Sequence, residues 1–143
     1  MYGWTCSLGV CKIDPIKFKS RIISALRKLT WSWPPRKEVS DRAKRAPATF
    51  ECAKCSYWCY TGKSDKNFKA LQEEYPKQKL KMEKTRDDHV LPVIDVKDGF
   101  VDWNTLIERM FCAEENWQVL CDTCHDEKTK QEREERKKWK KKK

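Results

Sequence analysis

The chain has 143 residues, of which 38% are apolar and 38% are charged, and its formal net charge is +10. This composition is typical of one small packed domain with charged appendages, and it excludes a large hydrophobic core. No segment approaches the ~20 consecutive apolar residues of a membrane helix, and residues 1–11 lack the basic and apolar regions of a secretion signal. We therefore expect a cytoplasmic protein without membrane segments.

The charge is unevenly distributed along the chain. Residues 1–50 carry 11 basic and 3 acidic side chains, residues 51–129 carry 12 and 16, and residues 130–143 carry 9 and 3. An acidic centre between basic ends is typical of a protein that binds a polyanion with its flanks and a divalent cation in its middle. Lysine-rich ends that only keep a chain soluble give the same pattern. We divide the chain into a basic helical arm (1–49), a core (50–130) and a basic helical tail (131–143).

The arm is predicted to contain two basic helices. Asp14 suits a helix N-cap, Pro15 suits the first helical position, and apolar residues recur at helical spacing as far as Leu29. The segment WSWPP, residues 31–35, should end this helix, because proline removes a hydrogen-bond donor and restricts the residue before it. A second short helix is predicted over residues 36–45, with a proline two residues later as its stop.

The basic faces of these two helices provide candidate contacts to nucleic acid, although a merely solvated face would have the same composition. Trp31 and Trp33, at the joint between the helices, are expected to pack the helices together rather than to stack on bases. The candidate contact residues of the arm are Arg21, Arg27, Lys28, Arg36, Arg42 and Arg45.

The core is predicted to be a small α+β fold. Residues 88–94 have the pattern of a buried strand with polar residues at its start, and a turn at Asp98-Gly99 follows. Asp102 is suited to cap a helix over residues 103–111, which carries its apolar residues on one face. Residues 119–121 are predicted to form a short strand or turn.

For two further segments, the sequence does not define both the type of structure and its bounds. Residues 67–84 are strongly charged and fit either a helix broken at Pro76 or an exposed loop. From Cys124 onward we expect a helix that continues into the basic tail.

Four of the eight cysteines predict a structural zinc site. Cys52 and Cys55 form one Cys-x-x-Cys pair, and Cys121 and Cys124 form another. Thiolates at this spacing can occupy two corners of a tetrahedron, so the two pairs together complete a four-cysteine site with no open position for substrate. Such a site would stabilise a small core, because zinc binding is coupled to folding. Four reduced, packed cysteines are the alternative.

The other cysteines have no assigned role. Cys59 lies close enough to Cys55 in sequence to replace it as a ligand, and Cys112 follows an apolar helical face that favours burial. Cys6 and Cys11 are either ligands without evident partners or free thiols.

Beside the zinc pairs, the chain has the residue order Asp88-His89, then Asn116, then CDTCHDEKT at residues 121–129. This order resembles the zinc-containing HNH endonucleases, whose active unit is a ββα-metal finger, and more narrowly the small HNH proteins common in bacteriophages. The resemblance covers residues 16–130. It implies a ββα-metal core that is held together by the four-cysteine zinc site. It also implies a phage protein that acts in the host cytoplasm.

The resemblance also implies roles for individual residues. His89 matches the general base, whose imidazole can accept a proton near neutral pH. Asp88 and His125 match the ligands of a catalytic divalent cation, with Mg²⁺ expected and Mn²⁺ or Ni²⁺ suited to a histidine ligand. Asn116 matches the asparagine that braces the loop carrying the base, and Lys128 is expected to contact phosphate.

Each assignment has an alternative. His125 could serve as a zinc ligand in place of a cysteine, Asp88-His89 could be an ordinary hydrogen-bonded pair, and Asn104 is a second candidate for the asparagine, although it lies within a predicted helix.

The sequence therefore predicts two alternative functions. The first is a metal-dependent DNA endonuclease that hydrolyses phosphodiester bonds with one catalytic cation, acting on double-stranded DNA as a monomer or homodimer. The second is a non-catalytic HNH-like zinc module that binds nucleic acid or docks on a larger phage packaging or transcription complex.

Overall fold

Two helices, α1 (Pro15–Leu29) and α2 (Pro34–Ala43), form the N-terminal part of the computed structural model, which describes residues 5–6, 9–10 and 14–140. They are preceded by a pair of two-residue antiparallel strands, β1 (Thr5–Cys6) and β2 (Gly9–Val10). The side chain of Cys6 and the whole of Cys11 lie outside the described residues.

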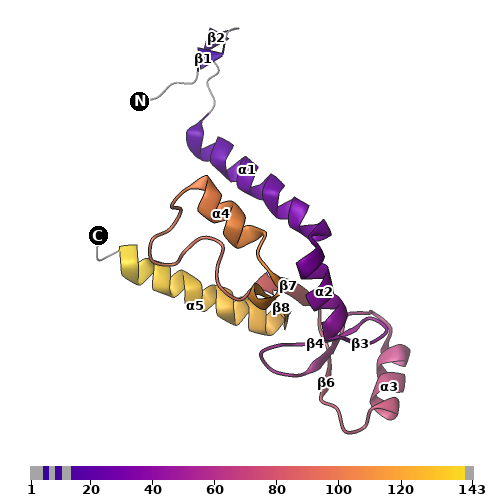
Figure 1. Cartoon of the computed structure of the whole chain (residues 1–143). Helices are drawn as coiled ribbons and strands as arrows, with labels where there is room; N and C mark the ends of the chain where they lie inside the picture. Colours follow the sequence, from indigo (N-terminus) through magenta and orange to yellow (C-terminus); the bar gives the residue numbers. More distant parts are fainter. Residues whose placement is uncertain (1–4, 7–8, 11–13, 141–143) are drawn as a thin grey trace.

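The predicted bounds of α1 are confirmed. Asp14 caps the helix, because its Oδ1 accepts a hydrogen bond of 2.9 Å from the backbone N–H of Ile16, and Pro15 occupies the first position. A short 3₁₀ turn, η1 (Thr30–Ser32), links α1 to α2. Figure 1 shows the two helices running one after the other along one side of the molecule.

The predicted second helix is shifted toward the N-terminus. It begins at Pro34 rather than Arg36, because prolines are tolerated in the first turn, where the N–H groups have no partner within the helix. It ends at Ala43 rather than Arg45, because the next residues pair with a neighbouring strand.

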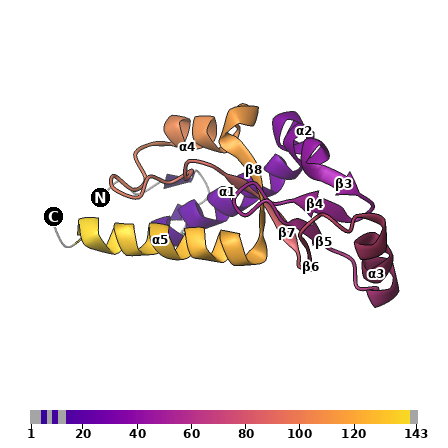
Figure 2. The same ribbon diagram turned by 90° about the horizontal axis from the view of Figure 1, so that it is seen from below.

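A four-stranded sheet follows, in the order β3 (Lys44–Ala46), β4 (Thr49–Glu51), β5 (Trp58–Tyr60) and β6 (Leu80–Met82). The first three strands are antiparallel and β6 is parallel to β5. The connection between β5 and β6 contains α3 (Asp65–Glu74), which lies at the far end of the molecule from α4 and α5 (Figure 2). The segment 67–84 is therefore a helix that ends just before Pro76, followed by a loop and a strand.

A second sheet pairs β7 (Thr85–His89) with β8 (Trp117–Cys121) in antiparallel register, and the long helix α5 (Asp122–Lys140) begins directly after β8. His89 pairs with Trp117 at one end, and Thr85 pairs with Cys121 at the other. Strand β8 therefore begins at Trp117, whereas the short element predicted from the sequence begins at Val119.

The prediction of a strand over residues 88–94 is wrong except at its first two residues. The strand ends at His89, and the apolar segment after it has no strand partner, so Leu91 is 69% exposed. Polar residues occupy the strand itself because each finds an ion pair: Arg86 with Asp122, Asp87 with Arg36, and Asp88 with Lys128.

Between the two strands of this sheet the chain makes a long excursion. It contains a turn in which Gly99, with a φ of 72°, donates its N–H to the carbonyl of Asp95, then α4 (Trp103–Met110) and a 3₁₀ turn, η2 (Glu114–Asn116). The predicted turn and the predicted cap are both confirmed: Oδ1 of Asp102 accepts a hydrogen bond of 2.8 Å from the N–H of Thr105. The loop before α4 runs between α4 and α5 (Figure 1).

Helix α5 passes without interruption through the boundary placed between core and tail at residue 130. Arg136 donates a hydrogen bond of 3.0 Å to the carbonyl of Ile94, so the helix beyond that boundary packs on the core. None of the helices in the described ranges combines the length and the apolar composition that a membrane span requires.

Candidate functional site

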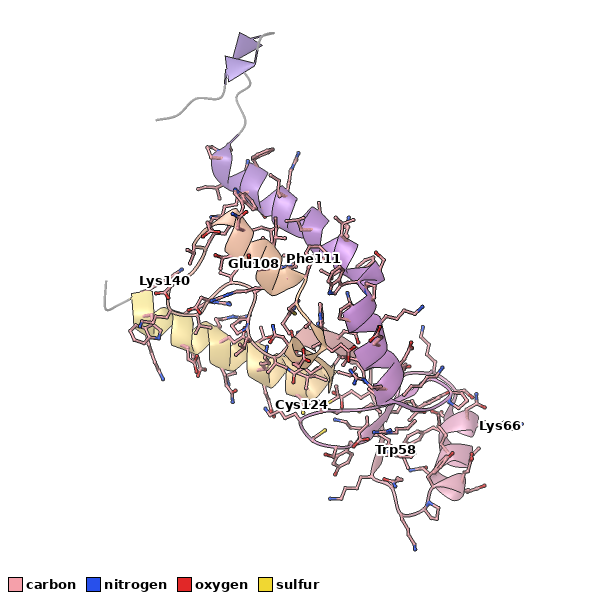
Figure 3. All side chains as sticks on the ribbon, in the orientation of Figure 1. Trp58, Lys66, Glu108, Phe111, Cys124 and Lys140 are labelled. Atoms are coloured by element: carbon pink, nitrogen blue, oxygen red, sulfur yellow. The ribbon has the colours of Figure 1, made fainter. Side chains whose placement is uncertain are left out.

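Four cysteines meet where the two sheets adjoin α5. Their sulfur atoms all lie within 4.8 Å of one another, and Sγ of Cys55 is 3.9 Å from Sγ of Cys121. Cys52 and Cys55 lie in the turn after β4, and Cys121 ends β8. Cys124 lies in the first turn of α5 (Figure 3). This four-cysteine cluster can hold a metal ion, and four converging thiols suit tetrahedral zinc.

The turn that carries the first pair is shaped by backbone hydrogen bonds. Cys52 donates its N–H to the carbonyl of Tyr57, and its carbonyl accepts one from Ser56, which adopts a positive φ of 59°. Burial opposes ionisation of the Cys52 thiol, but backbone N–H groups, among them that of Cys121 3.4 Å from Sγ, outweigh it and lower its pKa to about 7. These donors prepare a thiolate for a metal.

A lysine contacts the four-cysteine cluster at Cys121. Nζ of Lys81 donates a hydrogen bond of 2.9 Å to Sγ of Cys121 and forms an ion pair of 2.6 Å with Glu83. Glu83 in turn accepts a hydrogen bond of 2.6 Å from the hydroxyl of Thr123, at the start of α5. The positive charge of Lys81 offsets part of the negative charge that four thiolates would carry.

Neither of the alternative cysteines joins this cluster. Cys59 is fully buried, its Sγ contacts the carbonyl of Tyr57 at 3.5 Å, and burial raises its pKa to about 12. Sγ of Cys112 accepts a hydrogen bond from the side chain of Asn116. Both act as packed thiols in the described structure.

A groove of about 650 Å³ lies beside the four-cysteine cluster. It is lined by residues of α1, the joint between α1 and α2, the start of α2, strand β7 and the loop after it, the end of α4, the start of β8, and α5. Four of the core residues singled out in the sequence line it: Asp88, His89, His125 and Lys128. Both histidines of the chain therefore face one groove.

The basic residues of the arm divide into two sets. Arg27 and Arg36 line the groove, whereas Arg21, Lys28, Arg42 and Arg45 do not. Arg42 is paired with Glu114, and Arg45 lies 2.6 Å from Glu51, so acidic neighbours neutralise part of the predicted basic surface.

His89 ends β7 and is held between two neighbours. Its Nε2 lies 3.0 Å from the carbonyl oxygen of Met110, and its ring centroid lies 3.9 Å from that of Trp117. Burial lowers the pKa of His89 below its usual value, and the charges of Lys128 and Arg36 add to this effect. A carbonyl partner requires a proton on Nε2, so the neutral ring has its lone pair on Nδ1.

The carboxylate of Asp88 forms an ion pair with a lysine. Its Oδ2 lies 2.8 Å from Nζ of Lys128, which also lies 2.7 Å from Oε1 of Glu132 and 2.8 Å from the carbonyl oxygen of His89. Although burial opposes it, hydrogen bonding to the two carboxylates raises the pKa of Lys128. Lys128 thus contacts oxygens of the protein rather than extending into solvent.

His125 lies on α5, one residue after Cys124, yet it lines the groove and is not a member of the four-cysteine cluster. Among the described residues, its polar neighbour is Asp126, whose Oδ1 is 3.5 Å from Nδ1. His125 therefore does not replace a cysteine in the cluster.

Asn116 fastens the loop that follows His89. Its Oδ1 accepts a hydrogen bond of 2.7 Å from the N–H of Leu91, and its carbonyl accepts one of 2.8 Å from the N–H of Val90. Asn104, the other candidate, is exposed on α4. Asn116 is thus placed to fix the position of the loop without lining the groove itself.

Several groove residues were not found from the sequence. Glu132 and Arg136 were assigned to a separate tail, although with His125, Lys128 and Thr129 they recur at the three- and four-residue spacing of one helix face. That spacing was the sequence signal that could have placed these residues on one face of α5.

The chain matches no protein-family model, no curated protein and no solved structure.

Proposed function

We propose that this protein is a metal-dependent DNA endonuclease of the HNH type, with a structural zinc in the four-cysteine cluster. The observation that carries the proposal is the convergence of Asp88, His89 and His125 on one groove. The antiparallel pair β7 and β8 followed at once by α5 supports it, because this is the order of elements that a ββα-metal finger has.

In this proposal Asp88 and His125 would hold a divalent cation, with Mg²⁺ or Mn²⁺ as the expected metal. A bound cation supplies charge stabilisation to the phosphate and to the departing oxygen. Nδ1 of His89 takes the proton of the attacking water, the new P–O bond forms, and the bond to the 3′ oxygen breaks. The carbonyl of Met110 fixes the tautomer that leaves Nδ1 free.

The surroundings of His89 support this role. Trp117 packs against the ring, and Asn116 holds the next two residues by their N–H groups. Arg27 gives the groove positive charge at the side of the arm, which suits a phosphate backbone, whereas the charge of Arg36 is paired with Asp87. Asn116 is thus a positioning residue in this proposal rather than a reacting one.

The direct test is cleavage of supercoiled plasmid by the zinc-loaded full chain, with Mg²⁺ or Mn²⁺ added. We expect nicked or linear product from the wild type and none from His89→Ala, because general-base catalysis contributes roughly 10²–10⁴-fold to rate. Zinc content and DNA binding should remain close to those of the wild type. Asn104→Ala, a change at an exposed position on α4, is the matched control and should cleave normally.

Metal-dependent cleavage that survives in purified His89→Ala would contradict the proposal. Mapping the ends of the products then distinguishes nicking by a monomer from cutting of both strands by a symmetric dimer.

One observation favours the alternative of a non-catalytic zinc module that binds nucleic acid or docks on a phage complex. The carboxylate of Asp88 already has a cationic partner in Lys128. A module of this kind would bind DNA but cleave none at any concentration of Mg²⁺ or Mn²⁺, so the same plasmid assay separates the two functions.

A further inference from the structure

The two tryptophans at the joint between α1 and α2 lie in opposite environments. Nε1 of Trp33 donates a hydrogen bond of 2.8 Å to the carbonyl of Cys112, and its ring packs edge-on against Phe111 at 5.4 Å. Phe111 is labelled beside this joint in Figure 3. Trp31, two residues earlier, is 71% exposed. Trp33 therefore packs the joint against the end of α4 rather than packing the two arm helices together, and Trp31 is exposed.

Trp31 is exposed at a particular place, because it lines the groove that holds Asp88, His89 and His125. Within the described part of the chain, its ring contacts no other aromatic ring and no cationic group. An exposed indole without a packing partner contributes little to the stability of a fold, and it offers a flat apolar face to a ligand.

The backbone beneath Trp31 is firmly held. Thr30 is 4% exposed, its hydroxyl donates a hydrogen bond of 2.7 Å to the carbonyl of Arg27, and it accepts one of 3.2 Å from Arg36. Arg36 is anchored further by its ion pair of 2.9 Å with Asp87 on β7. The 3₁₀ turn therefore holds the backbone that carries the indole, and two arginines that flank Trp31 in the sequence, Arg27 and Arg36, line the same groove.

An aromatic face beside arginines at a groove is the combination by which proteins bind unpaired nucleotides. The arginines attract the phosphates, and the aromatic ring stacks on a base. Inside an uninterrupted duplex both faces of each base are covered by its neighbours, so only the terminal base pairs leave one face free to meet the indole. An unpaired or flipped nucleotide has such a face.

We propose that Trp31 stacks on an unpaired base next to the phosphate held in the groove, and that the substrate of this protein is DNA with unpaired nucleotides rather than an uninterrupted duplex. This inference rests on the proposed endonuclease function for the identity of the polyanion. It departs from the expectation, drawn from the sequence, of a double-stranded substrate.

The test is equilibrium binding of the zinc-loaded full chain to fluorescently labelled DNA, with no divalent cation added so that no cleavage occurs. Three probes of the same sequence are compared: a single strand, a blunt duplex, and a duplex with a short single-stranded gap. We expect Trp31→Ala to weaken binding to the single strand and to the gapped duplex roughly tenfold or more, and to leave binding to the blunt duplex unchanged.

Two further variants separate stacking from general effects. Trp31→Phe retains an aromatic face and should keep most of the affinity for unpaired DNA. Leu29→Ala removes an exposed apolar side chain, 59% accessible, that does not line the groove, and it should bind all three probes like the wild type.

Equal affinity of Trp31→Ala and the wild type for all three probes would overturn the inference, as would an equal loss on the blunt duplex. Failure of the endonuclease proposal would give a different result, namely absence of cleavage with any metal, and would leave these binding differences intact.

Discussion

Lys128 and Asp88 form an ion pair of 2.8 Å inside the groove, so the aspartate proposed to bind a divalent cation already contacts a cation supplied by the protein. The same ammonium group contacts Glu132 at 2.7 Å. A divalent cation at Asp88 must therefore compete with Lys128, and the affinity of the site depends on that competition.

Replacing Lys128 by methionine should strengthen binding of divalent cations. Removal of the ammonium leaves Asp88 without its cationic partner and Glu132 with Arg136 alone, which favours Mn²⁺ by about tenfold, or ~1.4 kcal/mol. Mn²⁺ binding can be measured by electron paramagnetic resonance on the zinc-loaded protein. Lys130→Met, an exposed position on the same helix, is the control and should bind Mn²⁺ like the wild type. Weaker binding by Lys128→Met would show that the lysine supports the site rather than competing for it.

Replacing Lys81 by methionine should weaken retention of zinc. Lys81 donates a hydrogen bond to Cys121 and supplies a positive charge next to the four thiols, and loss of such a partner typically lowers metal affinity by roughly 10–100-fold. Competition with a chromogenic chelator measures this affinity. Lys77→Met, an exposed change in the loop after α3, should leave it unaltered. Equal zinc affinity in Lys81→Met would mean that the hydrogen bond has no effect on the metal.

Acid should destabilise the protein in part through His89. Burial lowers the pKa of this side chain in the folded state, which favours the neutral imidazole. In the unfolded chain the imidazole has its ordinary pKa of about 6.5, so it takes up a proton at a higher pH than in the folded state. The stabilising contribution is complete above that value and is lost as the pH falls below it. We expect the difference in unfolding free energy between the wild type and His89→Gln to shrink from pH 7.5 to pH 5, as measured by urea denaturation without added divalent cations. A constant difference would contradict the neutral state of His89.

Replacing Asn116 by alanine should loosen the loop after His89. The side chain accepts a hydrogen bond of 2.7 Å from the N–H of Leu91, and loss of one such bond costs about 1 kcal/mol. Hydrogen exchange at the Leu91 amide should become faster in Asn116→Ala, while amides of β5 exchange as in the wild type. An unchanged Leu91 amide would show that the loop is held by other contacts.

Local signals in the sequence predicted α1 and α4 well, whereas α2 is shifted by two residues and α3 was left open between a helix and a loop. Asp14 with Pro15, and Asp102 with its following apolar face, specify helix starts through contacts within three residues, which a sequence pattern reveals directly. The four-cysteine cluster was equally accessible, because two Cys-x-x-Cys pairs in one chain are typical of a metal site.

The remaining structure depends on contacts between distant segments. Strand β7 was misplaced because its polar residues are satisfied by Arg36, Asp122 and Lys128, which all lie far from it along the chain. Strands β3 and β6 have three residues each, too few to show a period of two. Similarly, only the folded groove separates Trp31 from Trp33, since their local sequence contexts are nearly alike.

Cys124 and His125 are consecutive residues in the first turn of α5, and consecutive side chains on a helix project about 100° apart. The helix therefore works as a fixed spacer: while its cysteine is held in the four-cysteine cluster, the rotation of the next residue toward the groove is already determined. Inserting one residue between them would leave the cysteine in place and turn the histidine to another side. Because the spacing is set by a single peptide unit, a change of length at this point would alter the direction of His125 relative to the four-cysteine cluster.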